Sequence, residues 1–124
     1  MAVDVFRAYV HLLRFDFLLA RRGFPAVHEQ VRKSCVRQQS RTLDAPERIC
    51  HAFDLACVLY FKQVRCLQRS AATAVLLRRS GFAAQLVIGV QPCPFRAHAW
   101  VELDGCVVND KSYVASMYQV LERC

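Results

Sequence analysis

Residues 66–81 read CLQRSAATAVLLRRSG, and this stretch decides how the rest of the chain is arranged. Its small and apolar residues recur at helical spacing, which predicts an amphipathic helix with Arg69 and Arg79 outside the apolar stripe. The small residues at 70–74 would let this helix lie close to its neighbours. Cys66 would occupy the first turn, where unpaired amide N–H groups and the positive end of the helix dipole favour a thiolate. The stretch therefore predicts a helix that carries a nucleophilic cysteine at its start.

Two downstream residues could complete a catalytic site with this thiol. His98 lies in the strand-like run AHAWVEL and Asp110 ends the run CVVND, with the hairpin signal Asp104-Gly105 between them. A type I′ turn centred on Asp104 and Gly105 would place His98 opposite Lys111. A type I turn centred one residue earlier, with Gly105 as a left-handed bulge, would place His98 opposite Asp110. We expect the second register, because opposed residues on one face have Cβ atoms about 4.5–5.5 Å apart, and a carboxylate could then orient the imidazole.

The order cysteine, histidine, aspartate suits a nucleophile, a base and an orienting group. Asn109 competes with Asp110 for the last role, because some thiol hydrolases use a carboxamide there. Adjacent strand residues face opposite sides, so only one of the two can point at His98, and the expected register selects Asp110.

Four further residues could support a substrate or an oxyanion. A side-chain amide from Gln63 or Gln68 could donate to an oxyanion, beside the backbone N–H of Cys66. Arg69 could either anchor the structure or bind a substrate carboxylate, and the sequence leaves both open. Trp100, two residues after His98, is the fourth candidate.

Composition limits the class of protein. The chain has 124 residues, of which 55% are hydrophobic, enough for one domain over residues 1–124, with a helical part at 1–64 and a helix plus sheet at 66–124. No run is apolar enough for a membrane span or a signal peptide. The seven cysteines are then expected to be reduced, mostly buried thiols in a cytoplasmic protein.

The chain shows no paired CxxC or HExxH spacing, so we expect neither a metal site nor a cofactor. Its net charge of +7 could favour binding of a nucleic acid, an acidic peptide or an acidic partner protein. We expect no nucleic-acid binding, because no basic run is interleaved with aromatic residues.

The order of elements predicts an α+β fold, with N-terminal helices and the cysteine-bearing helix packed on a small antiparallel sheet. Helices are expected at residues 3–22, about 25–37 and 44–61, with a loop at 38–43. A strand is expected at 86–90, a loop at 91–94, then the hairpin, and a tail that could be either a short helix or a strand. The residues expected to face the core are Phe6, Val10, Leu13, Phe17 and Leu18 in the first helix, with Leu12 and Leu19 widening its stripe, Val27, Val31 and Cys35 in the second, and Ile49, Phe53, Ala56 and Tyr60 in the third.

These patterns resemble the lasso-peptide leader peptidases, a branch of the transglutaminase-like superfamily. The matching stretches are CLxRSxA at 66–72, LLRRxG at 76–81, VIGV at 87–90, FxAHAWVE at 95–102 and GxxVxD at 105–110. The resemblance implies a transglutaminase-like or papain-like core and a cysteine protease with Cys66 as nucleophile, His98 as base and Asp110 as orienting group. Such enzymes remove the leader from a ribosomally made precursor, whose freed amine a separate ATP-dependent cyclase then joins to a carboxylate.

The resemblance also implies partners. The chain has no room for a fused leader-binding domain, so a separate leader-recognition protein is expected to deliver the precursor's leader peptide. Two alternatives remain: another thiol acyltransferase on the same fold, and a non-catalytic module that binds a nucleic acid or an acidic peptide.

Overall fold

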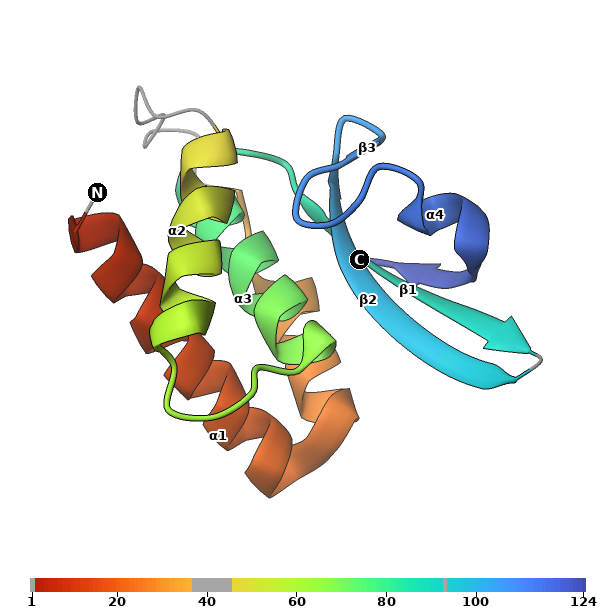
Figure 1. The fold of residues 1–124 in the computed structure, drawn as a ribbon, viewed down its shortest axis with the longest axis horizontal. Coiled ribbons are helices and arrows are strands. Elements are labelled where there is room, and N and C mark those ends of the chain that lie inside the picture. Colours follow the sequence, from red (N-terminus) through yellow and green to blue (C-terminus); the bar gives the residue numbers. More distant parts are fainter. Residues whose placement is uncertain (1, 37–45, 93) are drawn as a thin grey trace.

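The computed structural model describes residues 2–36, 46–92 and 94–124. The elements in chain order are α1 (Ala2–Lys33), α2 (Pro46–Leu59), α3 (Cys66–Arg79), β1 (Gln85–Pro92), β2 (Phe95–Leu103), β3 (Cys106–Val107), α4 (Val114–Met117) and β4 (Gln119–Arg123). The strands form one antiparallel sheet in the order β3-β2-β1-β4. Figure 1 shows the three long helices as a layer on one side of this sheet. The expected α+β architecture is confirmed.

The two expected N-terminal helices are both present within α1, and the expected break between them at Gly23 is confirmed. Gly23 interrupts α1 with φ 76° and ψ −173°, a left-handed region that favours glycine. Pro25 lies two residues further on and suits the first turn of the second half. That half ends at Lys33, earlier than the expected residue 37, so Cys35 lies beyond the helix and is exposed. The expected loop at 38–43 lies outside the described residues.

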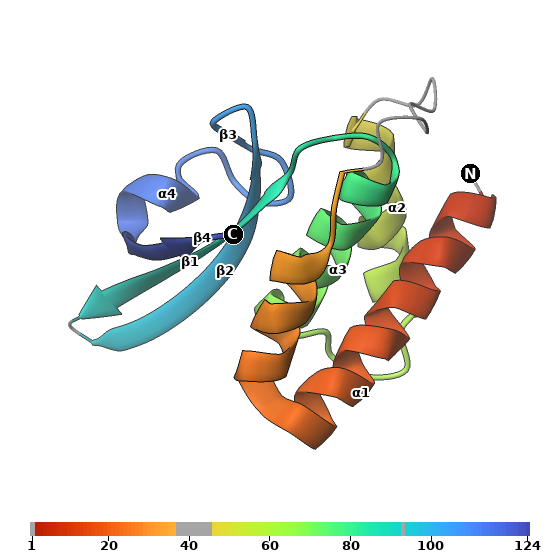
Figure 2. The same cartoon turned by 180° about the vertical axis from the view of Figure 1, so that it is seen from behind.

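Helix α3 is buried on almost every side, so its expected amphipathic character is wrong. Gln68 and every residue from 70 to 78 are buried. Helices α1 and α2 and strands β1 and β2 all contact α3, and Figure 2 shows it between the other helices and the sheet. The small residues at 70–74 allow this close approach from several sides. Helix α3 is therefore the central element of the fold.

The expected core face of α1 is wrong in part: Leu12 is buried and Leu18 and Leu19 pack against the core, but the other expected residues face outward. Phe6, Val10, Leu13 and Phe17 are 42–69% exposed, whereas the buried residues of this half are Ala8, His11, Leu12 and Phe15. Both faces of the helix carry apolar residues, so helical periodicity alone could not choose between them. Polar contacts fix the observed choice: Gln68 of α3 donates to the Leu12 carbonyl at 2.8 Å, and Tyr60 donates to Asp16 at 2.6 Å. The inward residues expected in α2, and Val27 and Val31 in α1, are buried as expected.

The sheet separates two apolar clusters. Leu86, Ala99 and Val101 join the main core with the helices. On the other face, Val87 and Trp100 pack with Val114 of α4. Strand β1 continues to Pro92, so the expected loop at 91–94 is wrong in part; Cys93 lies outside the described residues. The ambiguous tail forms both a single helical turn, α4, and the edge strand β4, which pairs with β1.

His11 provides a pH-dependent contribution to stability. Burial, together with Arg79, Arg14 and Arg7, lowers the pKa of His11 from 6.5 to about 4, and its Nδ1 finds no hydrogen-bond partner among the described residues. The folded state therefore favours the neutral ring. The contribution of His11 to stability is fully present above pH 6.5 and is lost as the pH falls towards 4. We expect a loss of about 2–3 kcal/mol across this window, measured by denaturant unfolding at pH 7 and pH 4.5.

A matched pair of variants isolates this contribution. His11→Leu should flatten the pH dependence, whereas His51→Leu should leave it unchanged, because His51 is exposed on α2. An equal slope in His11→Leu and in the unmodified protein would show that another group is responsible.

Candidate active site

Cys66 is exposed at the first position of α3, directly after Arg65. The side chain of Gln68 secures this helix start twice: its amide donates to the Leu12 carbonyl at 2.8 Å, and its oxygen accepts from the Arg65 backbone N–H at 3.4 Å. The N–H groups of the first turn have no partner within the helix, so they are directed at the space around the thiol. This end of α3 therefore offers a sulfur atom and backbone donors at one point.

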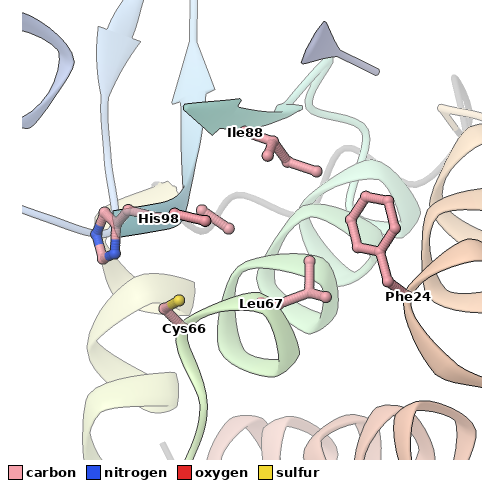
Figure 3. A pocket seen from close by; sticks show the side chains of 7 residues that line it. Phe24, Cys66, Leu67, Ile88 and His98 are labelled. Carbon is pink, nitrogen blue, oxygen red and sulfur yellow. The ribbon is translucent and has the colours of Figure 1, made fainter. Parts of the chain in front are cut away.

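A small apolar cavity of about 110 Å³ adjoins the thiol. Its lining residues are Phe24, Cys66, Leu67, Ile88, Ala97, His98 and Ala99. Figure 3 shows Cys66 and His98 together at one end of the cavity and Phe24 at the other end. The chain thus brings a thiol from α3 and an imidazole from β2 to the same opening, although they are 32 residues apart in sequence.

The His98 ring contacts Asp110 on the side that Nε2 faces. The distance from Nε2 to Oδ2 of Asp110 is 2.6 Å, and the other carboxylate oxygen accepts from the Lys111 backbone N–H at 2.7 Å. This contact engages Nε2 and not Nδ1. Partial burial alone would raise the pKa of Asp110, but the hydrogen bonds from His98 and Lys111 outweigh it and hold that pKa below its usual value.

The expected hairpin register is wrong, even though Asp110 reaches His98. Leu103 pairs with Cys106, and Asp104 and Gly105 have φ of 53° and 78°, as in a type I′ turn. Continued pairing in this register would oppose His98 to Lys111. Regular pairing stops at Val107, however, and the chain bends away from the sheet before Asp110.

Asn109 holds this bend. Its side-chain oxygen accepts from the Val101 backbone N–H at 2.7 Å, and its amide donates to Oγ of Ser70 at 3.0 Å. The Ser70 hydroxyl in turn donates to the Ala99 carbonyl at 3.0 Å. These contacts join β2, α3 and the segment that carries Asp110. Asn109 thus faces the interior while its neighbour faces His98; sequence reasoning treated the two only as competitors and missed the role of Ser70.

Two aromatic rings support the imidazole from the other side. Tyr118 stacks on His98 with ring centroids 5.3 Å apart, and Trp100 lies 6.1 Å from it. Gly89, opposite His98 in the β1–β2 pairing, makes room for these rings: a Cβ there would lie 2.7 Å from Trp100 and 2.8 Å from Tyr118.

Replacing this glycine tests whether the aromatic support matters. Gly89→Ala should destabilise the fold by about 1–3 kcal/mol, because the Trp100 ring and the Cβ of Tyr118 would have to move. Chemical denaturation measures the loss, and the near-ultraviolet circular dichroism of Trp100 and Tyr118 should change with it. Gly105→Ala is the control: it strains a positive φ in open space and should leave that aromatic signal unchanged. An unaltered spectrum in Gly89→Ala would contradict the close packing.

The other predicted supporting residues fall into different places. Gln63 is exposed and lines a second opening beside Cys66. Gln68 is buried and fully engaged by the contacts described above, and Trp100 is buried behind His98 with its indole N–H donated to Glu102 at 2.9 Å, so neither reaches the cavity. Arg69 forms an ion pair with Asp54 of α2, which favours the anchoring role of the two left open.

Comparison with known proteins identifies the family of the chain. The profile described as the transglutaminase-like superfamily matches residues 9–123. The chain belongs to the transglutaminase-like superfamily. The microcin J25-processing protein McjB of Escherichia coli is 47% identical to it over 45 residues, which cover 36% of this chain and 22% of that protein. The similarity therefore spans about a fifth of the relative's length. No solved structure matches the chain.

Within this transglutaminase-like chain, Cys66 is exposed, whereas Cys50 is buried and Cys57 and Cys124 are partly buried. Burial raises the pKa of the Cys50 thiol to about 11 and also raises the pKa of Cys57 and Cys124. The six cysteines in the described ranges are all free, but Cys35, Cys66 and Cys106 are exposed, so the expectation that most are buried is wrong. Of these three, Cys66 is the one that shares a cavity with a histidine.

No group of three or more potential metal-binding side chains was found in residues 2–36, 46–92 and 94–124. None of the helices in these ranges combines the length and apolar character that crossing a bilayer requires.

Proposed function

We propose that this chain is a cysteine peptidase that removes the leader from a ribosomally made lasso-peptide precursor. The observation that carries the proposal is that Cys66 and His98 line one cavity, with Asp110 in hydrogen-bond contact with Nε2 of the imidazole. Membership of the transglutaminase-like superfamily and the partial similarity to a microcin-processing protein support the same reaction class. The resemblance of the motifs around these residues to leader peptidases supports the substrate.

The proposed chemistry is acyl transfer to water. His98 takes the thiol proton through Nδ1, and the Cys66 thiolate attacks the carbonyl carbon at the leader–core junction. Backbone N–H groups at the start of α3 stabilise the oxyanion. The imidazolium then gives its proton to the leaving amine, which becomes the new N-terminus of the core peptide. A water molecule, deprotonated by His98, finally hydrolyses the thioester and releases the leader with a free carboxylate.

The proposal includes partners and a location. A separate leader-recognition protein would present the precursor, and an ATP-dependent cyclase would use the freed amine, all in the cytoplasm. The apolar cavity beside Cys66 would hold a side chain of the substrate near the cut, since its walls are formed by residues such as Phe24, Leu67 and Ile88.

The test is incubation of the purified chain with a lasso-peptide precursor, with and without its leader-recognition protein, followed by mass spectrometry. The proposal expects two products whose masses sum to that of the precursor plus one water. A leader joined to an added amine would instead identify an acyltransferase. An unchanged precursor, although the recognition protein and leader bind the chain, would contradict peptidase activity.

Asn109 is expected to act as a positioning residue for Asp110. Asn109→Ala removes the contacts to Val101 and Ser70, so kcat for cleavage should fall by up to roughly a hundredfold while KM changes little. Asn109→Asp should retain part of the rate, because a carboxylate still accepts from the Val101 N–H. Steady-state kinetics of both variants make the comparison. If the two lose activity only in proportion to lost folded protein, the role is merely structural.

A further inference from the structure

The outward face of α1 carries an apolar row with no role in the fold described above. Its members are Val3, Phe6, Val10, Leu13 and Phe17, with exposed fractions of 69, 69, 45, 42 and 64%. Their spacing alternates between three and four residues, which is the a and d pattern of a coiled-coil heptad. Figure 2 shows this half of α1 at the outer edge of the helical layer, and within the described ranges the other elements pack on its opposite face.

A row of arginines runs along one side of this apolar row. Arg7, Arg14 and Arg21 follow each other at seven-residue intervals, all exposed. In the heptad frame set by Val3 and Phe6 they occupy three successive e positions, which flank the seam of a coiled coil and pair with charges on the partner helix. The face therefore combines an apolar seam with a positive border, and we call it the arginine-bordered seam.

We propose that the arginine-bordered seam docks an amphipathic helix of a partner protein, with apolar residues at its own a and d positions and Glu or Asp beside them. Burying five large apolar side chains supplies the attraction, and the arginine border selects an acidic helix over a basic one. The net charge of +7 on the whole chain favours the same partner.

Two other occupants fit the seam less well. A second copy of this chain, packed antiparallel, would place one arginine row against the other, and two chains of charge +7 repel each other. An anionic lipid surface would attract the arginines. Binding to lipid, however, requires neither the strict seven-residue spacing nor an apolar row confined to the a and d positions.

The experiment uses two synthetic three-heptad peptides with Leu at a and d positions. One carries Glu at every e and g position, which also keeps it from pairing with itself, and the other carries Lys. Binding is measured by fluorescence anisotropy with the full chain as its Cys66→Ala variant, so the outcome does not depend on peptidase activity. We expect the Glu peptide to bind at least tenfold more tightly than the Lys peptide at low salt, with the difference shrinking at high salt.

Variants locate the binding on α1. The triple change Arg7→Glu, Arg14→Glu and Arg21→Glu should reverse the preference between the peptides, and Phe6→Ser with Val10→Ser should abolish binding. Val58→Ser on α2, at a side chain 81% exposed, and Arg96→Glu on β2 are the matched apolar and charge controls and should change neither.

Three results would overturn the proposal. The first is that both peptides bind equally tightly, or that neither peptide binds. The second is binding to vesicles of phosphatidylserine and phosphatidylcholine that the arginine reversals abolish, without peptide binding. The third is a dimer in sedimentation velocity that Phe6→Ser dissociates, which would assign the seam to a second copy of the chain.

Discussion

The Cys66→Ala variant is expected to lose cleavage of the precursor by a factor on the order of 10⁴ or more while its fold stays intact. The thiolate is the only group in the proposed mechanism that forms a bond to the substrate, so no remaining side chain can replace it. The side chain is exposed at the start of α3, and its removal leaves no internal cavity. Mass spectrometry of the precursor measures the rate, and denaturant unfolding checks the fold.

Cys106→Ala is the matched control for this variant. Cys106 is also exposed, but it lies in β3 and does not line the cavity that Cys66 shares with His98. Its replacement should leave cleavage at the unmodified rate. If cleavage survived in Cys66→Ala and were lost in Cys106→Ala, the nucleophile would lie at a different place in the fold.

Asp110→Asn is expected to reduce kcat by roughly 10²- to 10⁴-fold. In the proposed mechanism the carboxylate would hold the ring through Nε2, leaving Nδ1 for the thiol, and it would stabilise the imidazolium that forms when the thiol proton is taken. A carboxamide of the same shape can do neither in the same way. The lowered pKa of Asp110 means that it stays ionised until the pH is below its usual value near 3.8. Its contribution to stability is therefore present above about pH 4 and is lost only below that.

Asp104→Asn provides the same chemical change outside the site. Asp104 lies in the hairpin turn with φ 53°, a conformation that asparagine also adopts readily. This control should retain full activity. A normal rate in Asp110→Asn, or an equal loss in both variants, would show that the contact to His98 does not orient the ring.

The helical and strand patterns predicted the elements that carry the site better than they predicted how those elements pack together. Gly23 and Gly81 indicate where helices end, and the β-branched run at 86–90 indicates a strand. These signals come from residues that are close together in the sequence. The start of α3 at Cys66 followed from such local signals. The face of α1 did not, because both of its faces are apolar and the choice depends on contacts from Gln68 and Tyr60, distant in sequence.

The contact between His98 and Asp110 shows how a wrong register can still give a correct neighbour. The turn type depended on whether Asp104 would adopt a positive φ, and the sequence allowed either answer. The observed turn shifts the pairing by one residue from the expected register. The bend held by Asn109 then brings Asp110 back beside His98. That bend depends on Ser70 of α3, so no pattern within the hairpin could reveal it.

Covalent labelling tests the central claim most directly. A leader peptide whose scissile carbonyl is replaced by a vinyl sulfone should modify the chain once, and peptide mapping should find the adduct on Cys66. The same reagent should label His98→Ala and Asp110→Asn far more slowly, because the thiol then lacks its base or the support of that base. An adduct on Cys35 or Cys106 in place of Cys66, or equal labelling rates in all three proteins, would contradict a single site built from these three residues.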